Sequence, residues 1–116
     1  MEKKFWITTT FTNQLIKLVK KNDKIIVLDA DLADDVNLYS FQKKFPKKFI
    51  QNGIAEQDMV SMAGGLALMG FIPLVNSFAS FLSSRANEQI YNNATELTKI
   101  IYINLYAGLI PAGAGK

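Results

Sequence analysis

Carboxylates are the side chains of this sequence best suited to acid and base chemistry. The 116 residues include no Cys and no His, which excludes thiol nucleophiles, disulfides, Cys/His zinc sites and Ser-His-Asp triads drawn from this chain. Proton transfer must therefore use carboxylates, Lys, Tyr or a cofactor. Asp29 and Asp31 follow an apolar run, and Glu56 precedes another. These acids are the first candidates for a functional site.

Two further groups could belong to such a site, and each also has an ordinary structural explanation. Glu56 and Asp58 stand where a helix is expected to begin, so both could simply complement the helix dipole in its first turn. Phe78 and Phe81 are three residues apart just after a predicted strand, a spacing that is typical of core residues. Neither group by itself shows whether its residues have a functional role or only a structural one.

The glycine-rich segment at residues 107–116 invites comparison with a phosphate-binding P-loop. Its last residues, PAGAGK, place Lys116 after two glycines, as in a loop whose amides and lysine bind phosphate. The P-loop pattern requires a glycine five residues before Gly115, where this sequence has Ile110. A glycine loop of another kind is therefore favoured over a nucleotide-binding P-loop.

The elements that must position these residues alternate between helix and strand. Apolar spacing and β-branched runs predict helices at residues 8–21, 57–69 and 81–92, and strands at residues 24–29, 49–52, 71–77 and 99–105. This alternation predicts an α/β fold with a mostly parallel sheet and helices on both faces. Ligands of such sheets bind at the carboxyl ends of the strands, where Asp29 and Asp31 are expected.

Two segments between these elements carry structural hypotheses of their own. Residues 32–48 are polar and irregular and include a lysine cluster, so we interpret them as a solvated loop or short helix rather than an anion-binding patch. In the helix at residues 57–69, Gly64 and Gly65 follow Ala63. These small residues would let another backbone approach closely.

Composition indicates one soluble domain over residues 1–116. Thirteen Lys and Arg against ten Asp and Glu give a net charge of +3, too small an excess for a nucleic-acid binder. Residues 59–84 are uncharged, but the turn and polar residues within them argue against a membrane span: Gly64, Gly65, Gly70, Pro73, Asn76 and Ser77. The polar residues after Trp6 replace the apolar region of a signal peptide, so a cytoplasmic location is expected.

Taken together, the motifs carry more information than any one of them. The sequence contains DADL at residues 29–32, GIAEQDMV at 53–60, AGGLA at 63–67, and FASF at 78–81 followed by Arg85-Ala86. In order and spacing, residues 24–116 resemble the pyrimidine-binding domain of transketolases and related thiamin-diphosphate enzymes. GIAEQ is the most distinctive element. The resemblance implies a thiamin-diphosphate-binding fold that these residues represent only in part.

The resemblance implies a role for each matched residue. Glu56 corresponds to the catalytic glutamate that hydrogen-bonds N1′ of the aminopyrimidine and favours the tautomer that deprotonates the thiazolium C2. Burial disfavours the charged form of a carboxyl group, which suits a group that shares a proton. Phe78 and Phe81 correspond to aromatics that flank the pyrimidine, and Ile54 to a residue that lines the same pocket. Asp31 corresponds to an aspartate near the thiazolium.

The family reaction transfers a two-carbon ketol unit between sugar phosphates, and three departures bear on that substrate. Tyr106 stands where transketolases commonly carry a His, and Gly113-Ala114 replaces an acidic pair. Arg85 falls one residue later than in the nearest family pattern. A related enzyme with another ketol or acyl donor therefore fits as well.

The resemblance also implies a missing half. In this family the diphosphate and its Mg²⁺ are held by another domain through a Gly-Asp-Gly to Asn motif, which is absent from these 116 residues, so no metal ligand is assigned here. We expect a partner domain or subunit and an oligomer, such as a dimer. The positions of Met1 and Lys116 suggest the beginning of a truncated C-terminal subunit. A non-catalytic assembly module of the same fold is the alternative.

Overall fold

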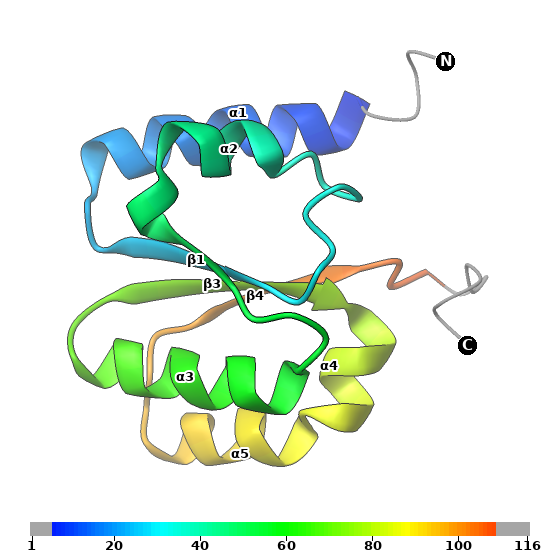
Figure 1. Cartoon of the computed structure of the whole chain (residues 1–116). Coiled ribbons are helices and arrows are strands. Elements are labelled where there is room, and N and C mark those ends of the chain that lie inside the picture. The colour runs from blue at the N-terminus through cyan, green and yellow to red at the C-terminus, as the bar shows by residue number, and fades with distance from the viewer. Residues whose placement is uncertain (1–5, 109–116) are drawn as a thin grey trace.

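The computed structural model describes residues 6–108 as alternating strands and helices around one parallel sheet (Figure 1). Its strands are β1 (Ile25–Asp29), β2 (Phe49–Gln51), β3 (Ile72–Phe78) and β4 (Ile101–Leu105). Its helices are α1 (Trp6–Lys21), α2 (Tyr39–Lys44), the 3₁₀ helix η2 (Pro46–Lys48), α3 (Glu56–Leu68), α4 (Ala79–Arg85) and α5 (Asn87–Thr95). Ile110, Gly115 and Lys116, on which the P-loop comparison depends, lie outside the described residues.

The sheet has the order β2-β1-β3-β4, and every pair is parallel. Figure 1 shows α1 and α2 on one face of the sheet and α3, α4 and α5 on the other. The predicted α/β class, with a parallel sheet and helices on both faces, is therefore confirmed. All five residues of β1 are buried, as expected of a central strand that is covered on both faces.

Alternation along the strands divides the core into two layers. In β1, Ile25 and Val27 pack with residues of α1 and α2, whereas Ile26 and Leu28 pack with Met59 of α3. Successive side chains of a strand point to opposite faces of its sheet, so each helical layer receives its own set of apolar residues. The same alternation decides which polar side chains of β3 face α3.

The interpretation of residues 32–48 as a solvated segment is wrong for part of its length. Four of its residues are at most 3% exposed and belong to the core layer beneath α1: Ala33, Val36, Leu38 and Phe41. These residues follow neither the helical nor the strand period, because the backbone changes direction between them and Asn37 has a positive φ of 54°. A periodicity argument could not identify them as core.

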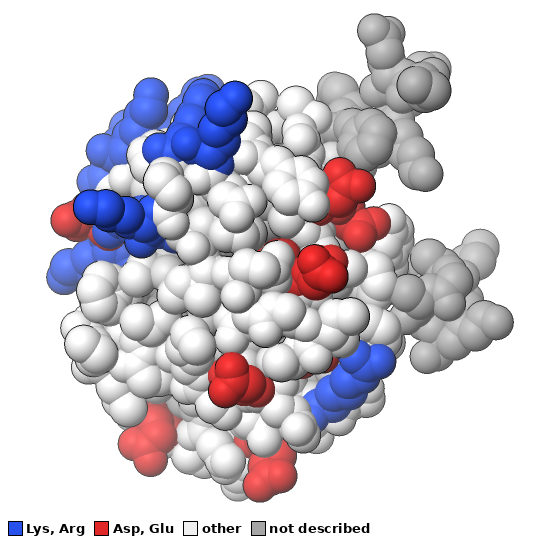
Figure 2. Space-filling model, viewed as in Figure 1, with Lys and Arg blue, Asp and Glu red and all other residues white. Residues whose placement is uncertain are grey.

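The lysines of this segment agree with the solvated interpretation. Lys43, Lys44 and Lys47 are exposed, and together with the lysines at the end of α1 they form a basic region on the α1 and α2 side of the molecule (Figure 2). The region lies at the amino ends of β1 and β2. It is therefore at the opposite edge of the sheet from Asp29 and Glu56.

The helix predicted at residues 81–92 is two helices in the structure. Ala86 separates α4 from α5 with a non-helical φ of −107° and ψ of 16°. Leu82 and Ala86 are both buried in the layer around α3, and the change of direction lets α5 pack on α3 as well. No Gly or Pro marks the break, so the sequence contains no conventional signal for it. No helix within residues 6–108 has the length and apolar character needed to cross a membrane.

The predicted close approach of another backbone at the small residues of α3 is wrong: a side chain approaches Gly64, and nothing within residues 6–108 approaches Gly65. A Cβ at Gly64 would collide with the Asn93 side chain of α5, whereas a Cβ at Gly65 would meet no atom within 4 Å. The approaching group is a side chain rather than a backbone. The Nδ2 of Asn93 donates a 2.8 Å hydrogen bond to the Val60 carbonyl oxygen and so joins α5 to α3.

Gly64→Ala should therefore destabilise the full chain, while Gly65→Ala should not. The first change displaces Asn93 and breaks its bond to Val60, which costs about 1–3 kcal/mol in the free energy of unfolding. The second replaces an exposed helical glycine and should add up to about 1 kcal/mol of stability. Urea unfolding followed by circular dichroism measures both. Equal effects of the two substitutions would contradict this account of the α3–α5 contact.

Candidate functional site

A cleft at the beginning of α3 brings together residues from two parts of the chain, residues 54–58 and residues 84–85. It has a volume of about 550 Å³, and its lining includes Ile54, Glu56 and Arg85. Glu56 is the first residue of α3, and Arg85 is the last residue of α4. Since α3 follows β2 and α4 follows β3, the cleft lies at the carboxyl edge of the parallel sheet, where ligands of such folds bind.

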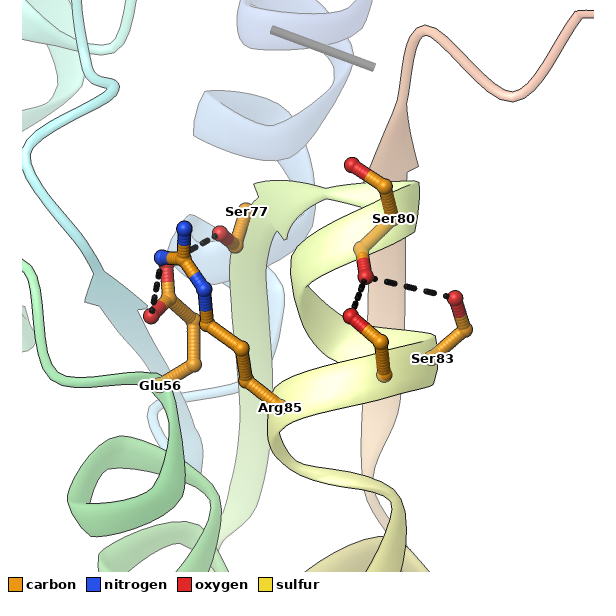
Figure 3. Close-up of polar contacts among 6 residues, drawn as sticks. Glu56, Ser77, Ser80, Ser83 and Arg85 are labelled. Carbon is orange, nitrogen blue, oxygen red and sulfur yellow. Dashed lines mark hydrogen bonds and ion pairs between the residues drawn. The ribbon is translucent and has the colours of Figure 1, made fainter. Parts of the chain in front are cut away.

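Glu56 is the buried carboxylate of this cleft, with 3% of its surface exposed. Its Oε1 accepts a hydrogen bond from Ser77 Oγ at 3.2 Å, and its Oε2 pairs with Arg85 Nη1 at 3.3 Å. Figure 3 shows Ser77 at the end of β3 and Arg85 on α4, both directed at the carboxylate. Burial of a carboxylate requires such donors. The first helical turn adds partial positive charge from its free amides.

Asp58 shows what an ordinary acid at a helix start looks like, and the contrast bears on Glu56. Asp58 is exposed, and its Oδ2 accepts a 3.1 Å hydrogen bond from Asn52 Nδ2. The helix-dipole interpretation explains this arrangement fully. It does not explain Glu56, because a role limited to the dipole would leave that carboxylate in water.

Aromatic side chains extend the site from Arg85 toward the sheet. The guanidinium carbon of Arg85 lies 3.7 Å from the centre of the Phe81 ring, a cation–π contact. The Phe78 and Phe81 rings lie 5.3 Å apart and are tilted by 47°. Phe78 is buried, whereas Phe81 is partly exposed. The pair thus includes one partly exposed ring, that of Phe81, which the guanidinium paired with Glu56 contacts.

The remaining predicted site residues are placed differently from one another. Ile54 is 74% exposed and lines the cleft, so its apolar side chain is available to a ligand. Asp31 is exposed and does not line the cleft. Its backbone nitrogen donates to Gln51 Oε1 at 2.9 Å, and its φ is 63°. The structure therefore places Ile54 and Glu56 in the cleft, connects Phe81 and Phe78 to it through Arg85, and leaves Asp31 on the neighbouring loop.

Tyr106, just after β4, joins this edge through two contacts. Its ring meets Phe78 edge-on at 5.2 Å between centroids, and its hydroxyl donates a 3.1 Å hydrogen bond to Asp35 Oδ1. The bond to Asp35 is the main reason that the pKa of Tyr106 is raised above its ordinary value of 10.0, with burial and the Asp35 charge adding to it. Tyr106 thus links the aromatic pair to the loop after β1.

Two contributors to the site were not recognised from the sequence as partners of Glu56. Ser77 lies 21 residues from it and Arg85 lies 29 residues away. Signals for both exist in retrospect. Ser77 shares the strand parity of Val75, which faces α3, and Arg85 follows Phe81 by four residues, a spacing that places two side chains on one helical face.

The described part of the chain holds no group of three or more Cys, His, Asp or Glu side chains arranged for a metal ion. The polar side chains that line the cleft are Glu56, Gln57, Asp58, Ser84 and Arg85, and Glu56 is the one buried carboxylate among them. This set can hold a planar ligand that has both an apolar face and an N–H group. Glu56 would accept from the N–H, and the face would lie against Phe81.

Comparison with known proteins identifies the family that this sequence matches. Residues 3–116 match the family model described as the transketolase pyrimidine-binding domain. The chain is 47% identical over 78 residues to a protein of Methanocaldococcus jannaschii that is named as a transketolase C-terminal section. It is 30% identical over 100 residues to the 1-deoxy-D-xylulose-5-phosphate synthase of Clostridium acetobutylicum. These alignments include 67% and 86% of this chain but only 25% and 16% of the two relatives.

A solved structure has a similar backbone. It is titled as a split gene transketolase, an inactive beta4 tetramer, and it superimposes with a TM-score of 0.74 at 36% sequence identity. The likeness covers 84% of this chain and 33% of that one. The chain therefore corresponds to about a third of that polypeptide and to a quarter or less of the two relatives above.

Tyr106→Phe tests the link between the aromatic pair and the loop after β1. Because Tyr106 is about half exposed, the lost hydrogen bond should cost at most about 1 kcal/mol of unfolding free energy at pH 7. Folding raises the pKa of Tyr106, so its contribution is complete below pH 10 and is lost as the pH rises through the raised value. Urea unfolding of both full-length proteins at pH 7 to 11 measures this, and a difference independent of pH would contradict it.

Proposed function

Since the chain belongs to the transketolase family through its pyrimidine-binding domain, we propose that it forms the pyrimidine side of a thiamin-diphosphate site. Residues 1–116 are one partial domain in this proposal. When bound, thiamin diphosphate supplies a nucleophilic carbon and an electron sink. The chain supplies a proton acceptor, an aromatic surface and an apolar wall.

One observation carries the proposal: the space beside Phe81 holds a cationic N–H donor against a buried carboxylate. The Arg85 guanidinium lies over the Phe81 ring while its Nη1 donates to Glu56. An aminopyrimidine combines the same features, a flat π-surface and ring nitrogens that carry or accept protons. The residues present therefore fit this end of the cofactor. Arg85 is about half exposed, so it is free to turn toward solvent and leave room.

The proposed roles follow from these positions. Glu56 holds a proton at N1′ of the pyrimidine and is the catalytic residue of this chain. Phe81 and Phe78 flank the ring, and Ile54 closes the apolar side. Asp31, on the loop after β1, serves the thiazolium side. Ser77 keeps the Glu56 carboxylate oriented by donating a hydrogen bond to its Oε1, the oxygen that does not pair with Arg85.

The proposed reaction is transfer of a two-carbon ketol unit between sugar phosphates. A related reaction with another ketol or acyl donor is the second candidate, because a 1-deoxy-D-xylulose-5-phosphate synthase is 30% identical over 100 residues. The Tyr106 hydroxyl points to Asp35 at this edge, where the nearest family pattern has a histidine. The difference concerns the substrate side and leaves the Glu56 and Phe81 contacts unchanged.

The proposed partner is a diphosphate-binding domain or subunit that also holds Mg²⁺. The similar solved structure, a split gene transketolase titled as an inactive tetramer, supports an oligomer assembled from separate polypeptides. In this proposal the assembly, a dimer or larger, acts in the cytoplasm on small sugar-phosphate substrates and binds neither nucleic acid nor membrane.

Native mass spectrometry of the tagged protein from its own cells, with Mg²⁺ and thiamin diphosphate present, tests the assembly. The expected species contains a second polypeptide and about one cofactor per pair. A cofactor-free species under these conditions would refute the cofactor site. It would favour the alternative of a non-catalytic assembly module.

Glu56→Ala should abolish ketol transfer and leave assembly intact. Loss of a group that transfers or holds a proton in catalysis typically reduces turnover by about 10²–10⁴-fold. Glu88→Ala is the matched control, because Glu88 is an exposed acid in the first turn of α5. Turnover is measured by coupled assay, and assembly by the mass of the complex. Unchanged turnover in Glu56→Ala would overturn the role of this residue.

A further inference from the structure

A second buried carboxylate lies at the same edge of the sheet, outside the cleft. Asp29, the last residue of β1, has no exposed surface. Its Oδ1 accepts a 2.6 Å hydrogen bond from Asn76 Nδ2, and its Oδ2 accepts from Gln51 Nε2 and from the Leu32 amide, both at 3.0 Å. Strand register explains the meeting, since Asp29 pairs with Gln51 of β2 and with Asn76 of β3.

Asp29 sets the direction of the Gln51 side-chain amide. An ionised carboxylate only accepts hydrogen bonds, so the NH₂ group of Gln51 must face it and the Gln51 carbonyl oxygen must face away. That oxygen accepts from the amides of Asp31 at 2.9 Å and Gly53 at 3.0 Å. If the Gln51 amide turned over, its NH₂ would oppose two N–H donors. By orienting the Gln51 amide, Asp29 therefore fixes the acceptor for the loop after β1, at Asp31, and for the loop after β2, at Gly53.

The loop after Gly53 leads directly to Glu56. Gly53 has a φ of +70°, which only glycine adopts without strain. Its carbonyl oxygen accepts a 2.9 Å hydrogen bond from the Ala55 amide, and α3 begins at the next residue. A hydrogen-bonded path thus runs from Asp29 through Gln51, Gly53 and Ala55 to the start of the helix that carries the carboxylate.

We infer that Asp29 is a positioning residue for Glu56, acting through Gln51. The inference rests on the proposed function of Glu56. Asp29 does not line the cleft and touches no ligand in this arrangement. Its role is to fix the two loops that place Glu56 and Asp31 on either side of the site. Asn76 holds Asp29 from the other strand, and the Asn76 Oδ1 has no donor within residues 6–108, so that amide is also oriented by Asp29.

We call the hydrogen bond from Gln51 to Asp29 the bridge. Exchanging its donor and its acceptor tests the inference in the full chain with its partner. Gln51→Glu places a second carboxylate against Asp29 and should free the loop. The double variant Asp29→Asn with Gln51→Glu restores a donor and an acceptor between these two positions in the opposite order, while the Leu32 amide loses its acceptor because Oδ2 becomes an NH₂ group. The new carboxylate at position 51 can still accept from Asp31 and Gly53. Gln14→Glu, an exposed change on α1, is the control for added charge.

Hydrogen exchange and thiamin diphosphate affinity are the two measurements. In cofactor-free protein, the amides of Asp31 and Gly53 should exchange at least about tenfold faster in Gln51→Glu. The Gly53 amide, which lies away from Leu32, should recover in the double variant. The Kd of thiamin diphosphate with Mg²⁺, measured by calorimetry, should rise about tenfold and recover in parallel, as when an outer residue that orients a binding group is lost. The control should match the unmodified protein in both.

The outcomes separate this inference from the proposed function. Unchanged exchange in Gln51→Glu, or faster exchange with unchanged affinity, overturns the role of Asp29. If the unmodified complex binds no thiamin diphosphate, the proposed function fails, and the exchange data still decide whether the bridge holds the loop. Should Gln51→Glu fail to fold, Gln51→Ala removes the bridge without repulsion and is judged by the same two measurements.

Discussion

The burial of two carboxylates at one edge of a parallel sheet is the constraint on which this structure depends. A buried charge requires hydrogen-bond donors, and the donors here come from separate elements. Glu56 accepts hydrogen bonds from Ser77 of β3 and from Arg85 of α4. Asp29 accepts hydrogen bonds from Asn76 of β3 and from Gln51 of β2. Strand register, the start of α3 and the path of α4 must therefore agree before either carboxylate is satisfied.

The two carboxylates are satisfied in different ways, which suits different tasks. Glu56 pairs with a half-exposed arginine, a partner that can exchange with a ligand. Asp29 accepts instead from two side-chain amides and one backbone amide of the scaffold. One carboxylate is thus placed to receive a ligand, and the other is placed to hold the surrounding backbone.

Sequence reasoning reached most of the fold because buried parallel strands leave clear patterns. The β-branched run before Asp29 identified β1, and alternation of elements gave the sheet. The break at Ala86 and the core residues of the segment before β2, such as Phe41, escaped because neither follows a period. Among the predicted site residues, Glu56 and Ile54 line the cleft, and Phe81 and Phe78 adjoin it through Arg85. The Arg85 partnership escaped because it depends on α4 returning across 29 residues to α3, which local patterns do not encode.

The sheet order also has a consequence for how the chain folds. The central pair β1 and β3 is not adjacent in sequence, and the Asp29–Asn76 contact between them spans 47 residues. To pair these strands, the chain must first lose the entropy of closing a long loop, and the contacts that offset this loss form only afterwards. Parallel sheets are therefore slow to form. The helices can form locally much sooner. We therefore expect the carboxyl edge to take shape late in folding and the apolar strands to be exposed to aggregation until then.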